Sequence, residues 1–182
     1  LRIPDLQLHF APAMVIDHGR TSVWGHGLGC HVCLLRPKSR GEVTLNSADP
    51  FEDPKIDPKF LSHPDDMRDM IAGYKKMMNI LNSGAVSKYT SSHVQRPVDI
   101  NDDKDIEQAI REDADTVYHP VGTCKMGNDE MSVVDDSLKV YGLDGLRVVD
   151  ASIMPTLIGG NTNAPTIMIG EKASDMIIND WS

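Results

Sequence analysis

The pattern of apolar residues changes near residue 115, and this change limits the fold of the 182-residue sequence more than any other feature. Upstream, short alternating segments are followed by two helical patterns. Downstream, glycines interrupt short extended runs before a last helix. Alternating strands with one face in water usually pair antiparallel. We therefore expect an α+β fold with an antiparallel sheet, flanking helices and a C-terminal part of different character.

Three strands are expected within the first 60 residues. They lie at 6–10, 30–35 and 42–46, with a turn at Arg40-Gly41 between the last two. Three prolines then break the chain into short extended pieces. Because the sequence opens inside a strand pattern, without a signal peptide, we expect it to be a fragment of a longer protein.

Two amphipathic helices should follow these strands. The first begins at Pro64, capped by Ser62 or His63, and is expected to stop at Gly84. Its methionine-rich stripe fits core packing better than an adaptable binding groove. The second, acidic helix is expected over 102–114, and its inward-facing residues should be Ile106, Ala109 and Ile110.

Beyond residue 115, the segment 116–120 should be extended, because a residue before proline avoids the helical region. Two short strands are expected at 138–141 and 146–149, the second ending in Asp150. A last helix is expected over 165–179, capped by Asn163. Its inward stripe should be Ile169, Ala173, Met176 and Ile177.

Charge and cysteine content exclude several classes of protein. Acidic residues outnumber basic ones 27 to 18, giving a net charge of −9 that would repel nucleic acid. No apolar run approaches the roughly 18 residues of a transmembrane segment. Three cysteines, an odd number, argue against a disulfide scaffold and favour a reducing compartment, hence the cytoplasm.

The most promising candidates for chemistry are His119 and the loop Gly159–Pro165. Two glycines and two asparagines lead into a helix start, where unpaired N–H groups favour negative charge. His119 stands between Tyr118 and Pro120, and Gly122 allows close backbone approach. Spacing alone nevertheless favours structural roles for this histidine and for both asparagines.

Two other constellations are weaker. Cys30 and Cys33, with His26 and His31 nearby, resemble part of a zinc site, but in a strand these cysteines face opposite sides. We therefore expect no metal. A hydrolytic triad of Ser152, Asp150 and His119 lacks the G-x-S-x-G turn.

Three motifs in the second half occur in a recognisable order. They are YHPVGTCKMG at 118–127, GLRVVDASIMP at 145–155 and GNTNAPTIMIGEK at 160–172. Together they closely resemble the C-terminal region of the glucose-methanol-choline (GMC) family of flavin oxidoreductases, most of all its choline dehydrogenase and bacterial alcohol dehydrogenase branch. LLRPKSRG at 34–41 and IDPKFL at 56–61 extend the resemblance over nearly the whole chain.

The resemblance implies an α/β FAD domain and a substrate domain. Residues 1–112 would form part of the substrate-binding domain, and 113–182 would complete the FAD domain, whose N-terminal Rossmann part is absent. The family oxidises alcohols while flavin takes the hydride. This implies a primary alcohol substrate, choline-like or aliphatic, and a quinone or other carrier as electron acceptor. Peripheral attachment to the inner membrane stays open.

By the same resemblance, His119 and Asn161 are the catalytic pair. His119 would accept the hydroxyl proton, and Asn161, at a position that is His or Asn in the family, would bind the substrate oxygen. Cofactor contacts would come from Asp150 and Ala151 near the ribityl chain of the flavin, from Asn161, and from backbone contacts of Thr162 and Asn163 to the flavin ring.

One departure from the family is the absence of a G-x-G-x-x-G motif after a strand. We therefore expect the isolated chain neither to bind FAD firmly nor to turn over substrate. The alternative is a stand-alone metal- or ligand-binding module.

Overall fold

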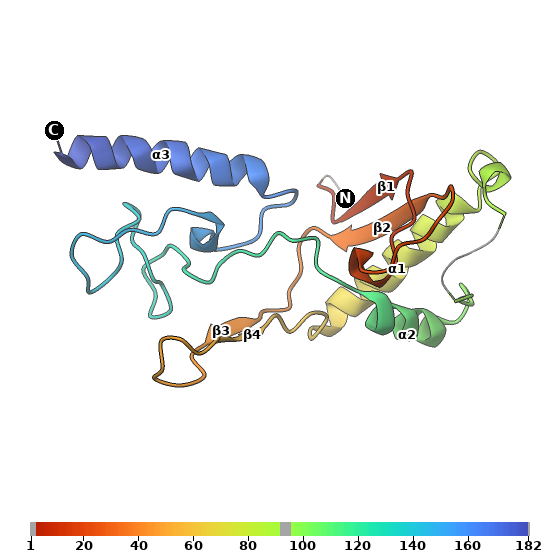
Figure 1. Cartoon of the computed structure of the whole chain (residues 1–182), viewed down its shortest axis with the longest axis horizontal. Helices are drawn as coiled ribbons and strands as arrows, with labels where there is room; N and C mark the ends of the chain where they lie inside the picture. Colours follow the sequence, from red (N-terminus) through yellow and green to blue (C-terminus); the bar gives the residue numbers. More distant parts are fainter. Residues whose placement is uncertain (1–2, 92–95, 182) are drawn as a thin grey trace. The chain divides into compact units, whose positions relative to one another are not determined.

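The computed structural model describes residues 3–91 and 96–181 (Figure 1). Its strands are β1 (Leu6–Ala11), β2 (Gly29–Leu34), β3 (Glu42–Thr44) and β4 (Lys55–Asp57), and its α-helices are α1 (Pro64–Leu81), α2 (Asp103–Asp113) and α3 (Asn163–Trp181). Three single 3-10 turns complete the elements: η1 (Asp17–Gly19), η2 (Ser87–Tyr89) and η3 (Ala151–Ile153). Among the described helices, none combines the length and apolarity needed to cross a membrane.

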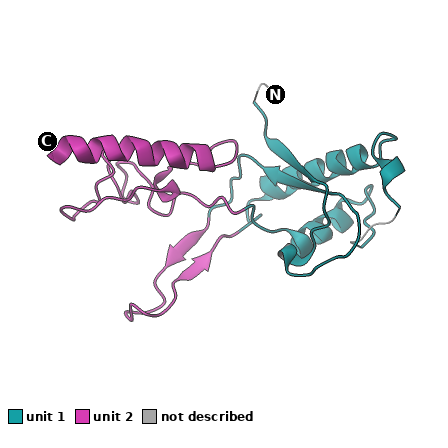
Figure 2. Cartoon of the chain, turned by 45° about the horizontal axis from the view of Figure 1, so that its top comes forward, with its two compact units in different colours: residues 1–40, 60–117 teal, residues 41–59, 118–182 magenta. Residues whose placement is uncertain are grey.

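The chain divides into two compact units (Figure 2). The first comprises residues 1–40 and 60–117, and the second comprises 41–59 and 118–182. Its contacts thus group the segment 41–59 with the C-terminal part of the chain. The polypeptide passes from one unit to the other three times. The expected division into a substrate part and a flavin part at residue 112 concerns the whole protein and stays a prediction.

Both small sheets are antiparallel hairpins. β1 pairs with β2 in a register running from Leu6 opposite Leu34 to Ala11 opposite Gly29, and β3 pairs with β4. The turn at Arg40-Gly41 therefore does not pair β2 with β3, contrary to expectation. The reason lies just after β2, where the backbone N–H groups of Lys38 and Ser39 bind a side chain of α1 instead of another strand.

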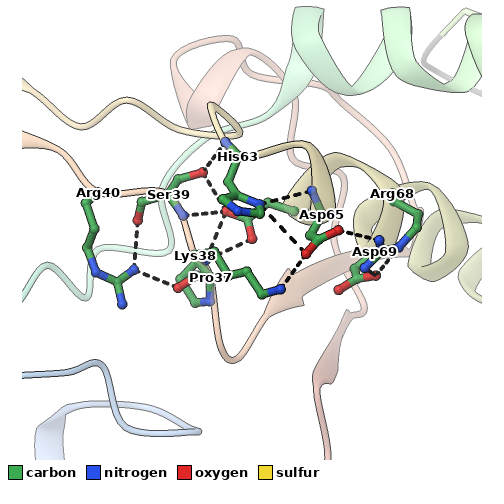
Figure 3. A network of polar contacts seen from close by, with 9 residues as sticks. Pro37, Lys38, Ser39, Arg40, His63, Asp65, Arg68 and Asp69 are labelled. Atoms are coloured by element: carbon green, nitrogen blue, oxygen red, sulfur yellow. Dashed lines mark hydrogen bonds and ion pairs between the residues drawn. The ribbon is translucent and has the colours of Figure 1, made fainter.

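That side chain is Asp66, which is only 3 % exposed. Its carboxylate accepts hydrogen bonds from the N–H groups of Lys38 and Ser39, each at 2.8 Å, and from the Ser39 hydroxyl at 2.5 Å. The hydroxyl of Ser39 in turn accepts the His63 N–H at 3.0 Å (Figure 3). Burial raises the pKa of Asp66, but the hydrogen bonds outweigh it, so the pKa lies below its ordinary value.

Helix α1 begins at Pro64, where the Nδ1 atom of His63 accepts the N–H of Asp65 at 3.2 Å and caps the helix. It ends at Leu81, so the predicted stop at Gly84 is three residues too late. Gly73 is buried against β2, where an added Cβ would lie 2.7 Å from Val32 Cγ2. The apolar core of this unit joins α1 to α2 through Met67, Ile106 and Ile110.

The acidic helix α2 agrees closely with expectation. Its N-cap is Asp102, whose side chain accepts the Lys104 N–H at 2.9 Å, and its C-cap is Ala114. Ile106, Ala109 and Ile110 are all buried, as the spacing predicts.

The second unit has its own core, formed by Val134, Leu138, Ile153, Met154, Ile169 and Ala173. The strands expected at 138–141 and 146–149 are reduced to isolated bridges, such as Lys139 with Arg147. Leu138 has a φ of +64°, which no regular strand accommodates. In addition, the N–H groups of Ser137 and Lys139 bind the Asp135 carboxylate instead of a neighbouring strand.

Helix α3 begins at Asn163, two residues earlier than expected, so Asn163 is its first residue and not its cap. Ile169 and Ala173 are buried and Met176 is half-buried. Ile177 is 38 % exposed, so its inward placement is wrong.

Candidate active site

His119 lies on a loop whose backbone bends on both sides of it. Tyr118 has a φ of +62° and Gly122 one of +87°, so the segment 116–120 is not uniformly extended as expected. A left-handed tyrosine costs of order 1–3 kcal/mol, and such conformations cluster at functional sites. At Gly122 an added Cβ would approach the Met154 carbonyl oxygen to 3.3 Å, which explains why a glycine occupies this position.

The second component is the start of α3. Asn161 is exposed, Thr162 is only 6 % exposed, and Asn163 opens the helix. Pro165 lies in the first turn, where its missing N–H costs nothing. The carbonyl oxygen of Thr162 accepts both the N–H and the hydroxyl of Thr166, at 3.0 Å and 2.7 Å, so the residue is held by the first turn.

The structure brings these two components together at the imidazole of His119. Its Nε2 atom lies 3.0 Å from Nδ2 of Asn161, and its Nδ1 atom lies 2.9 Å from Oγ1 of Thr162. Both ring nitrogens of a half-buried histidine are therefore engaged by consecutive residues. The sequence resemblance anticipated the approach of Asn161. It did not anticipate the Thr162 side chain, which the motif offered only as a backbone contact.

The chemistry of the donors defines how the ring is protonated. A side-chain amide nitrogen only donates hydrogen bonds, so Nε2 facing Asn161 Nδ2 accepts. A neutral imidazole then carries its hydrogen on Nδ1, where the threonine oxygen can accept it. This arrangement holds a lone pair on Nε2, and such a nitrogen can accept a proton from a hydroxyl group.

Asp150 and Ala151, the remaining predicted cofactor residues, lie at η3. The Asp150 carboxylate caps this turn by accepting the Ser152 N–H at 2.7 Å. The segment that follows His119 runs alongside, because the N–H of Cys124 binds the Ser152 carbonyl oxygen at 3.0 Å and that of Met126 binds the Ile153 carbonyl oxygen at 2.7 Å. η3 and the His119 loop are thus hydrogen-bonded neighbours.

The two cysteines of the possible zinc site, Cys30 and Cys33, do not point toward a common centre. Cys30 is opposite Phe10 and Cys33 is opposite Gln7, so the two thiols project from opposite faces of β2. Burial raises the pKa of both thiols and disfavours the thiolate that a metal requires. Within residues 3–91 and 96–181, no group of three or more candidate ligands is close enough to hold a metal ion.

Comparison with known proteins identifies the family. The sequence model of the GMC oxidoreductase family matches residues 37–170. The chain belongs to this family. Among other GMC oxidoreductases, it is 50 % identical over 175 residues to an alcohol dehydrogenase [acceptor] of Pseudomonas putida and 45 % identical over 174 residues to an oxygen-dependent choline dehydrogenase of Cronobacter sakazakii.

Each of these alignments covers 96 % of the chain but only 32 % and 31 % of the two relatives, respectively. A solved structure of formate oxidase from Aspergillus oryzae RIB40, determined to study modification of its FAD, superimposes with a TM-score of 0.90 at 32 % identity. That superposition covers 97 % of this GMC chain and 32 % of the formate oxidase. The chain therefore spans about one third of the length of the relatives that it matches.

Proposed function

We propose that the chain is the C-terminal part of an FAD-dependent oxidoreductase that oxidises a primary alcohol, choline-like or aliphatic, to the aldehyde. The observation that carries this proposal is the contact of His119 with Asn161, which presents a basic nitrogen beside an amide donor. Support also comes from the relatives, which are described as alcohol and choline dehydrogenases.

The residues at the start of α3 fit a flavin ring. A flavin has a polar edge rich in carbonyl oxygens and ring nitrogens, and exposed Asn161 and Asn163 offer amide donors next to the first N–H groups of a 19-residue helix. The positive end of that helix would stabilise negative charge on the ring by about 0.3–1 kcal/mol, and by more if buried. We assign the ring contacts to Asn161, Thr162 and Asn163, and contacts to the flavin side chain to Asp150 and Ala151.

The proposed reaction divides the substrate hydrogens between two acceptors. The alcohol oxygen would replace the Asn161 amide as the partner of Nε2, and the amide would then donate to that oxygen. His119 would take the hydroxyl proton as the C–H bond breaks and the carbonyl forms. A bound flavin would supply the hydride acceptor, so that one alcohol yields one aldehyde, one proton taken by His119 and one hydride, which carries the two electrons. The electrons would leave to a quinone or another carrier.

The test is an assay of the full-length flavoprotein that contains these residues. Choline and a series of unbranched primary alcohols are supplied with an artificial electron acceptor, and the aldehyde formed is measured against the acceptor reduced. We expect one aldehyde per two electrons with at least one of the two substrate types. Turnover of neither type would contradict the proposal, and a preference between them identifies the substrate class.

A further inference from the structure

We propose that Thr162 is a positioning residue that sets the tautomer of His119. This inference rests on the proposed function, because it states how the proposed base is kept ready. Thr162 has not been given a side-chain role by the family resemblance, which implied only a backbone contact. The structure instead directs its hydroxyl oxygen at the histidine ring, 2.9 Å from Nδ1.

The hydroxyl is well placed to hold the ring. Thr162 is 6 % exposed, and the first turn of α3 holds its carbonyl oxygen with two hydrogen bonds from Thr166. A threonine just before a helix ordinarily uses its hydroxyl to accept a backbone N–H of the first turn. Here the hydroxyl contacts His119, a residue 43 positions away. The helix start therefore serves as a rigid support for the imidazole.

The two contacts of the ring depend on each other. The Asn161 amide nitrogen can only donate, which leaves Nε2 as the acceptor and places the ring hydrogen on Nδ1. The Thr162 oxygen accepts that hydrogen. Without the hydroxyl, the Nδ1–H group of a half-buried ring would lose its partner, and the tautomer with hydrogen on Nε2 would gain. That tautomer has no lone pair on Nε2 and cannot accept the alcohol proton there.

The direct test is nitrogen NMR of the His119 ring in the 182-residue chain, at a pH where the ring is neutral. The wild type should show Nε2 with the chemical shift of an unprotonated ring nitrogen and Nδ1 with that of a protonated one. Thr162→Val, which keeps the shape of the side chain, should move population to the other tautomer, and Thr162→Ser should preserve the wild-type spectrum. The matched control is Thr90→Val, which makes the same replacement at an exposed hydroxyl that binds the Ser87 carbonyl oxygen, and it should leave the tautomer unchanged.

Kinetics of the full-length flavoprotein provide the second readout. We expect Thr162→Val to lower kcat by about 10–100-fold with little change in KM, as for other residues that orient a reactive group. Thr162→Ser should restore the rate. A wild-type ring with its hydrogen on Nε2, or a Thr162→Val tautomer identical to wild type, would overturn the inference. These results are separate from the proposed function, which fails only if the full-length protein oxidises neither substrate type.

Discussion

The side-chain amide of Asn161 lies 3.0 Å from Nε2 of His119, although 42 positions separate the two residues in the sequence. Each residue reaches this contact by a different local device. His119 is turned by the left-handed conformation of Tyr118, and Asn161 precedes the first turn of α3. Both residues lie in the second compact unit, so the contact is made within one body.

The first prediction concerns Asn161. In the full-length flavoprotein, Asn161→Ala should lower kcat/KM for the alcohol by about 10²–10³-fold, because the donor to the developing oxygen charge is lost. Asn161→His should retain most of the rate, because its ring also offers an N–H donor. Steady-state kinetics test both variants. Equal losses for alanine and histidine would show that the hydrogen bond to oxygen is not what matters.

The second prediction concerns FAD and the 182-residue chain. In the proposed function the chain supplies contacts to the flavin ring, but its sequence has no G-x-G-x-x-G segment to hold the pyrophosphate. Purified chain mixed with FAD should therefore separate from it in gel filtration. Stoichiometric co-elution with the yellow cofactor would contradict this expectation.

The third prediction concerns the buried carboxylate of Asp66. Asp66→Asn should lower the free energy of unfolding by about 1.5–3 kcal/mol, because an amide presents donors to the N–H groups of Lys38 and Ser39. Asp69→Asn on the same helix is the control. The Asp69 carboxylate is 48 % exposed and pairs with Arg68, so its replacement should change stability by less than about 0.5 kcal/mol. Urea denaturation measures both, and equal effects would refute this reading of Asp66.

The Asp66 interaction also has a pH dependence. Its pKa is lowered by folding, so below its ordinary pKa the unfolded state binds more protons than the folded state. The stabilisation is therefore complete above about pH 4 and is lost as the pH falls through the folded pKa. Below about pH 4 the wild type should lose stability faster than Asp66→Asn.

The fourth prediction compares two helical glycines. Alanine favours a helix by about 1 kcal/mol over glycine. At Gly170 in α3 nothing lies within 4 Å of an added Cβ, so Gly170→Ala should stabilise the chain. At Gly73 the Cβ would lie 2.7 Å from Val32 Cγ2 and 3.2 Å from Leu6 Cδ1, and overpacking costs about 1–3 kcal/mol. Gly73→Ala should therefore destabilise it. Thermal unfolding of the two variants should move in opposite directions, and a shift in the same direction would contradict the packing of α1 on β2.

The helices could be predicted from the sequence because their signals are local. The acidic segment expected over 102–114, with Ile106, Ala109 and Ile110 on its inner face, places α2 to within one residue at each end. The stop of α1 was less accurate, since Gly84 follows a helix that already ends at Leu81. The start of α3 was predicted two residues too late, because an asparagine such as Asn163 fits the first turn of a helix as well as its N-cap.

The parts that could not be predicted depend on long-range contacts. β2 does not pair with β3, because the Asp66 carboxylate binds the N–H groups of Lys38 and Ser39. These residues are 28 and 27 positions from Asp66, so no local sequence pattern predicts the contact. The strand expected at 138–141 does not form, because the Asp135 carboxylate accepts hydrogen bonds from nearby backbone N–H groups and Leu138 has a positive φ. At the candidate site, family motifs indicated His119 and Asn161, whereas the hydroxyl of Thr162 required coordinates.

The most direct test of the central claim is anaerobic mixing of the full-length flavoprotein with the proposed primary alcohol substrate, while the loss of flavin absorbance is recorded. If His119 accepts the alcohol proton, His119→Gln should bleach about 10²–10⁴-fold more slowly while retaining its flavin. The control His26→Gln, at an exposed histidine, should bleach like the wild type. Bleaching of His119→Gln at the wild-type rate would contradict the claim.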